Sequence, residues 1–141
     1  MRIFRRLSCP GPAAGRPATP PDARRAVERL SEDEALRGDL TDEGYGPLLG
    51  VVAGLAIARA GRFASTDDLY LALRRLLKGA VDAAERSDFS TLAAAATPAL
   101  IAPDERAVLL GALPRRRGSA DEVAAGIAHA IAMATGLEEV P

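Results

Sequence analysis

The side chains that could support acid–base, nucleophilic or metal chemistry are few in this chain. His129 is the only histidine and Cys9 the only cysteine among 141 residues. A catalytic pair needs an activating group within hydrogen-bond reach, and the chain offers no second histidine or cysteine for that role. A lone cysteine also excludes an intrachain disulfide and a cysteine-based zinc cluster, which is typical of a reducing, cytoplasmic location. We therefore expect no enzymatic activity, no metal and no cofactor, and we expect His129 on the protein surface.

Adjacent carboxylates include the pairs Asp67–Asp68, Asp121–Glu122 and Glu138–Glu139, and the first two positions favour helix capping over catalysis. Asp67–Asp68 and Asp121–Glu122 each follow a serine at the start of an expected helix. Negative charge is stabilised there by the helix dipole. The third pair, Glu138–Glu139, lies near the end of the sequence. None of these pairs needs a catalytic explanation.

The densest positive charge outside the first residues is the run of Arg115, Arg116 and Arg117. Together with Arg24–Arg25 and Arg74–Arg75 it could bind phosphates. The formal net charge is only −1, and no stacking aromatic side chains accompany the run. A solvated loop explains the arginines better, so nucleic acid is an unlikely partner. Nucleic-acid binding through this loop is kept as the alternative function.

A row of small residues, Gly46, Gly50, Gly54 and Ala58, recurs at every fourth position. These positions fall on one stripe of a helix, and such stripes let two helix backbones approach closely. Each glycine inside a helix lowers the stability of the helix by about 1 kcal/mol relative to alanine, so a stripe of three glycines needs a structural or functional reason. One explanation is a seam with a partner chain. The other is the central helix of the protein's own bundle, and the sequence alone does not decide between them.

The stripe belongs to an apolar run, residues 47–58, that has no polar side chain on any face. A helix that is apolar all round is buried on all sides. Twelve residues extend only about 18 Å, whereas a bilayer span needs about 20 residues. We therefore expect protein to enclose Val51, Val52 and Ile57, and we expect no membrane span.

Residues 1–21 differ in composition from the rest of the chain. They contain five of the ten prolines, four arginines and no acidic residue. Proline lacks a backbone donor and fixes φ, so a flexible tail is expected here. Within it, Ile3, Phe4 and Leu7 would gather on one helical turn and are candidates for docking to a partner.

The remaining residues, 22–141, show helical periodicity, and no segment alternates like a strand. The expected helices cover residues 22–37, 41–61, 65–86, 103–113 and 119–136, with capping residues Thr41, Ser65 and Ser119 and a possible restart at Ser31. Residues 92–102 are expected to be broken by Pro98, and Gly61 is expected to end its helix in a left-handed conformation. The predicted fold is all-α: one compact bundle of about five short helices behind a disordered tail.

The core of such a bundle would be rich in alanine, which buries little apolar area per residue and stabilises the fold weakly. Association with another chain would bury further apolar area and so compensate for this weak stabilisation. We therefore expect a non-catalytic interaction module, acting as an accessory subunit of a larger assembly or as a small homo-oligomer. Its partner would be another protein chain, contacted through the glycine stripe. A small-ligand carrier has the least support, because no group of polar side chains accompanies the apolar helix.

Overall fold

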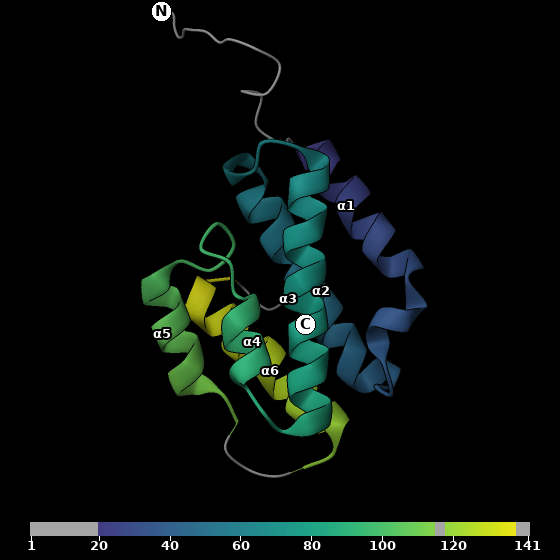
Figure 1. The fold of residues 1–141 in the computed structure, drawn as a ribbon, viewed down its shortest axis with the longest axis vertical. Helices are drawn as coiled ribbons and strands as arrows, with labels where there is room; N and C mark the ends of the chain where they lie inside the picture. Colours follow the sequence, from purple (N-terminus) through teal and green to yellow (C-terminus); the bar gives the residue numbers. More distant parts are fainter. Residues whose placement is uncertain (1–19, 115–117, 138–141) are drawn as a thin grey trace, which may run out of the picture.

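The computed structural model describes residues 20–114 and 118–137 of the chain, which form a compact all-α fold (Figure 1). This confirms the fold class expected from the sequence. Two 3-10 turns, η2 (Glu34–Arg37) and η3 (Ala60–Arg62), follow the first two helices. The α-helices of the described part are α1 (Pro20–Glu32), α2 (Asp42–Arg59), α3 (Thr66–Arg86), α4 (Ser90–Ala95), α5 (Pro103–Ala112) and α6 (Ala120–Thr135).

Helices α2 and α6 pack side by side and run in the same direction. At their N-terminal ends, the Thr41 backbone N–H donates to Asp121 Oδ1 at 2.8 Å and the Thr41 hydroxyl donates to Asp121 Oδ2 at 2.7 Å. Helix α3 packs on α1, α4 and α6 (Figure 1). Leucine and isoleucine fill the space between the helices. The largest fully buried side chains are Leu30, Leu48, Leu55, Leu69, Leu73, Leu76, Leu77, Leu92, Leu100, Ile101, Leu109 and Ile127.

The helix starts expected from the sequence are confirmed at three positions. The side chains of Thr41, Ser65 and Ser119 each accept a hydrogen bond from a backbone N–H in the first turn of the helix that follows. At Ser119 the bond is reciprocal, because Glu122 Oε1 accepts from the Ser119 backbone N–H at 3.0 Å. These bonds satisfy N–H groups that have no partner inside the helix.

Two expected helix starts were wrong. Helix α1 begins at Pro20 rather than at Asp22. Proline is tolerated in the first helical turn, where the missing N–H would have no helical partner. Ser31 does not restart the helix, because its hydroxyl donates to the Glu28 carbonyl at 2.9 Å and the chain passes into η2 after Asp33.

Two further details differ from the expectation. Gly61 lies inside η3, and the glycines with positive φ among the described residues are Gly38 and Gly136. Residues 92–102 were expected to be only a broken segment, whereas Ser90–Ala95 forms the short helix α4 before Pro98. Helix α4 packs against α3, and this tertiary contact supports a helix too short to be stable alone.

Tyr45 on α2 carries a polar atom that the fold leaves unpaired. Tyr45 is 5% exposed, and its buried hydroxyl has no hydrogen-bond partner among residues 20–114 and 118–137. A buried hydroxyl without a partner costs free energy, so we expect Tyr45→Phe to raise the free energy of unfolding by about 1 kcal/mol. Urea unfolding measures this, with Tyr70→Phe on the half-buried ring of α3 as the control. A loss of stability in Tyr45→Phe would show that the hydroxyl is bonded in solution.

Candidate functional site

Helix α2 has one buried face and one open face, although its sequence is apolar all round. Val52 is fully buried, Val51 is half-buried and Ile57 is 57% exposed. The expected enclosure by protein therefore holds for one face of the helix within a single chain. The other face meets solvent between α1 and α6, and no polar side chain in residues 47–58 marks it as a surface.

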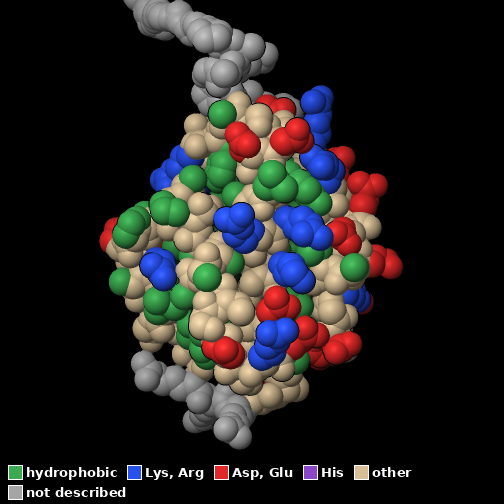
Figure 2. Space-filling model, viewed as in Figure 1, with side chains coloured by type: hydrophobic (Ala, Val, Ile, Leu, Met, Phe, Trp, Pro, Cys, Tyr) green, Lys and Arg blue, Asp and Glu red, His purple; other side chains and the backbone are tan. Residues whose placement is uncertain are grey.

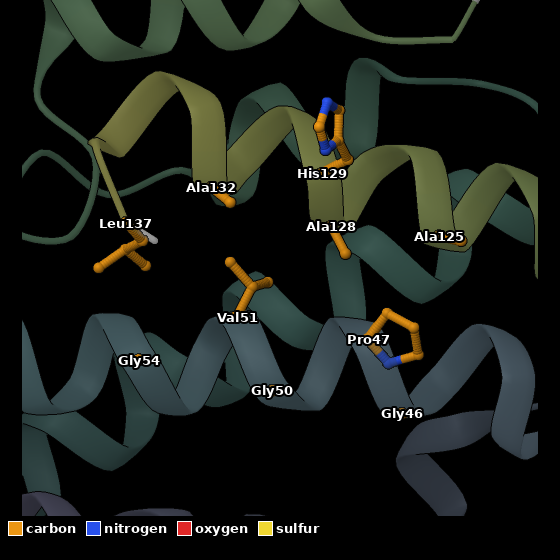
Figure 3. Close-up of a pocket in the computed structure, with 10 residues that line it drawn as sticks. All are labelled: Gly46, Pro47, Gly50, Val51, Gly54, Ala125, Ala128, His129, Ala132 and Leu137. Atoms are coloured by element: carbon orange, nitrogen blue, oxygen red, sulfur yellow. The ribbon is translucent and has the colours of Figure 1, made fainter. Parts of the chain in front are cut away.

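The open face of α2 borders a groove of about 650 Å³ between α2 and α6 (Figure 3). Pro47 and Val51 extend from α2 toward α6, and Ala128 and Ala132 face them (Figure 3). The ring of His129 points away from α2 (Figure 3). The groove is lined by Gly46, Pro47, Gly50, Val51, Gly54, Ala125, Ala128, His129, Ala132 and Leu137.

Two of the stripe glycines have no role in packing within the chain. Gly46 and Gly50 are exposed, and a Cβ atom added at either would meet nothing within 4 Å. At Gly54 an added Cβ would lie 3.4 Å from Leu137 Cδ1, which is an ordinary contact. Ala58 is exposed at the end of the same face. Packing of α2 within the described part of the chain therefore does not account for Gly46 and Gly50.

Other glycines, which the sequence did not single out, do serve close packing. A Cβ at Gly44 would lie 2.6 Å from the Cα atom of Asp121, and one at Gly79 would lie 2.6 Å from the Cβ of Ala95. At Gly126 it would lie 2.9 Å from Pro114 Cγ. The tight contacts of α2 with α6, of α3 with α4 and of α6 with Pro114 thus depend on glycines outside the stripe.

Comparison with protein-family models, curated proteins and solved structures finds no match to this chain. The function must therefore be argued from the chain's own residues and their geometry.

The chemistry available at the groove is apolar contact. His129 is exposed, as the sequence predicted, and is the only titratable side chain among the described residues of the lining. Within residues 20–114 and 118–137, no group of three or more histidine, cysteine, aspartate or glutamate side chains is placed to hold a metal ion. The described lining of the groove is therefore mainly apolar.

Several candidate residues from the sequence lie outside the described part of the chain. These are Ile3, Phe4 and Leu7 of the docking segment and Arg115, Arg116 and Arg117 of the alternative nucleic-acid site. Their proposed roles stay predictions. Among the other arginines considered for phosphate binding, Arg74 forms an ion pair with Asp33 at 3.5 Å and Arg25 forms one with Asp22 at 4.0 Å. Figure 2 shows basic side chains lying among acidic and apolar ones on the face over α3 and α4.

The segment Asp42–Arg62 is long and apolar enough to cross a membrane by length and composition, and 44% of its apolar window is buried inside the fold. The absence of a membrane span therefore stays a prediction, because the helical segment is longer than the apolar run considered in the sequence. Near its end, Arg59 is 8% exposed and bonded to Glu105 of α5.

The Arg59–Glu105 pair is a structural element that sequence reasoning missed. Arg59 Nη2 donates to Glu105 Oε2 at 2.7 Å, and Arg59 Nη1 donates to Glu105 Oε1 and to the Leu100 carbonyl. Glu105 also accepts from the Ala102 backbone N–H at 2.9 Å. The hydrogen bond from Arg59 lowers the pKa of Glu105 to about 2. Arg59 Nη2 also donates to the Thr135 carbonyl of α6 at 3.3 Å, so Arg59 joins the end of α2 to the start of α5 and to the end of α6.

Proposed function

We propose that this protein is a non-catalytic helical interaction module, which serves as an accessory subunit of a larger assembly or as a small homo-oligomer. Its contact surface is the open face of α2 together with the α2–α6 groove, and its partner is another protein chain. The observation that carries the proposal is the exposure of Gly46 and Gly50, which the chain's own packing does not require.

The energetics of α2 support this proposal. Each of these two glycines costs about 1 kcal/mol relative to alanine in a helix interior. A close helix–helix contact is a reason for such a stripe, because the missing side chains let backbones approach. Ile57 on the same face adds an exposed large apolar side chain. An apolar surface of this kind is typical of a site for protein association.

A small apolar ligand is a weaker interpretation of the same groove. A pocket for a small molecule usually combines apolar walls with a few polar groups that fix the ligand's orientation. Here the single polar lining side chain, His129, points away from α2 (Figure 3). Among the described residues, the groove therefore has no polar side chain directed at its centre.

Photo-crosslinking tests the proposal directly. Benzoylphenylalanine is placed at Ile57 in the full chain, expressed in its own organism, with the same substitution at Leu71 as the matched control. Ile57 is 57% exposed on the open face of α2, and Leu71 is 60% exposed on α3. We expect a discrete adduct with another protein chain from position 57 and none from position 71. Equal adducts from both positions, or none from position 57, would contradict the proposed function.

A further inference from the structure

Building on the proposed function, we propose that the partner is a second copy of this chain, with the open faces of the two α2 helices packed antiparallel about a twofold axis that crosses them at the level of residue 52. The open face of α2 is complementary to itself in this arrangement, and the charges at its two ends disfavour the parallel one. Twofold dimers are the commonest form of protein self-association, and they require such a self-complementary surface.

The first argument is the register of the small residues. An antiparallel pairing that sets Gly50 opposite the second copy's Gly54 also sets Gly46 opposite the second copy's Ala58. Every member of the stripe then faces another member. Because a Cβ at Gly46 or Gly50 meets no other described residue within 4 Å, the described part of the chain leaves the space beside these backbones open to the second helix. The backbones can therefore approach closely along the whole stripe.

The second argument is the fit of the large side chains. The same register sets Ile57, which is 57% exposed, opposite the second copy's Pro47. Pro47 lines the groove and is followed within one turn by Gly50. Ile57 of each copy would thus enter the groove of the other, so the twofold symmetry forms the same contact twice. This contact buries an apolar side chain that a single chain leaves in water.

The third argument is charge. Glu43 lies in the first turn of α2 and forms no ion pair in the described part of the chain. The antiparallel register brings it opposite the second copy's Gly61, next to Arg62. Arg62 is exposed, and within the described part of the chain its side chain donates one long hydrogen bond, 3.5 Å, to the Ala99 carbonyl. The two helix dipoles also oppose each other in this arrangement, which is favourable.

A parallel pairing would have the opposite electrostatics. It would place Glu43 beside the second copy's Glu43 and Arg62 beside the second copy's Arg62. Like charges held together destabilise a contact and exclude a wrong arrangement. The charges at the two ends of α2 therefore select the antiparallel orientation.

Sedimentation equilibrium of the full chain tests the existence of the dimer. We expect a mass of about twice the 14.7 kDa of one chain at tens of micromolar protein. Gly50→Leu places a bulky side chain at the crossing point, and we expect it to weaken dimerisation at least tenfold while helicity by circular dichroism is unchanged. Gly111→Leu makes the same change on α5 and should leave the mass dimeric. A monomeric wild type at 100 µM would overturn the inference.

Charge reversal tests the orientation without placing bulk at the crossing. We expect Glu43→Arg and Arg62→Glu each to weaken dimerisation about tenfold at low salt, since each of two symmetric contacts contributes roughly threefold. The double variant Glu43→Arg/Arg62→Glu should regain most of the affinity. Single variants that leave the affinity unchanged, or a double variant weaker than both, would contradict the pairing of these two residues.

Disulfide trapping tests the register. In a Cys9→Ser chain, Gly46→Cys/Ala58→Cys should form an intermolecular disulfide on mild oxidation, because the Cα atoms of closely packed helices reach the separation that a disulfide needs. The single variant Gly46→Cys should form no intermolecular disulfide. A parallel pairing would instead join position 46 of one chain to position 46 of the other. Crosslinking of the single variant at the rate of the double variant would overturn the antiparallel register.

These outcomes separate the inference from the proposed function. A monomeric chain whose position 57 photo-crosslinks to a different protein would overturn self-association and leave the interaction module standing. A position-57 adduct to residues 3–7 of the same chain would overturn self-association in favour of internal docking. No adduct at position 57 together with a monomeric wild type would overturn both.

Discussion

Replacing Glu105 by glutamine is expected to lower the free energy of unfolding by about 3 kcal/mol, because it leaves Arg59 as a buried charge without its counterion. The guanidinium side chain of Arg59 is 9% exposed, and the carboxylate side chain of Glu105 is 20% exposed. Breaking a buried ion pair costs about 3–5 kcal/mol, and the remaining exposure of Glu105 places the effect at the lower end. Urea or guanidinium unfolding measures the change.

The same pair predicts how stability depends on pH. The pKa of Glu105 is lowered from 4.5 to about 2 by the hydrogen bond from Arg59. A carboxyl whose pKa is lower in the folded state contributes its full stability above its ordinary pKa and loses it as the pH falls through its folded pKa. The difference in unfolding free energy between wild type and Glu105→Gln should therefore be constant above about pH 5 and shrink as the pH falls toward 2.

Asp104→Asn is the matched control for Glu105→Gln. Asp104 is the neighbouring carboxylate in the first turn of α5, and its side chain is exposed. We expect it to cost less than 1 kcal/mol, since it acts on Arg59 only at a distance. If Asp104→Asn destabilised the protein as much as Glu105→Gln, general electrostatics at the helix N-terminus would explain the effect and the specific ion pair would not.

Local features of this fold were predictable from the sequence because the sequence contains their causes. Ser65 and Ser119 cap their helices through atoms three residues apart, and the amphipathic pattern of residues 65–86 selects the buried face of α3. The position of α4 was not predictable in the same way, because its helix depends on packing against α3. The Arg59–Glu105 pair joins residues 46 positions apart, so no local pattern indicates it.

The candidate site was predictable only in part for a similar reason. The spacing of Gly46, Gly50 and Gly54 indicates a close-approach face, and two of these residues do lie on an open surface. The sidedness of α2 could not be read from residues 47–58, because exposure is normally marked by polar side chains and this run has none. Which face is open is decided by where α1, α3 and α6 pack.

Gly44 and Gly50 look alike in the sequence, yet alanine at the two positions is expected to change stability in opposite directions. A Cβ at Gly44 would lie 2.5 Å from Asp121 Oδ1 and 2.6 Å from the Asp121 backbone. Helix α6 must then shift, which disturbs the bonds from Thr41 to Asp121. Overpacking of this kind costs about 1–3 kcal/mol, and we expect a loss of about 2 kcal/mol for Gly44→Ala.

Gly50→Ala, in contrast, adds a methyl group to open space and removes the entropic cost of a glycine in a helix. We expect a gain of about 1 kcal/mol in the unfolding free energy of the single chain, so the two variants should differ by about 3 kcal/mol. Chemical denaturation at the lowest workable protein concentration measures both, because dilution removes any contribution from association. A destabilising Gly50→Ala under those conditions would mean that the chain itself fills the space beside Gly50. The argument that this face is left open for a partner would then lose its basis.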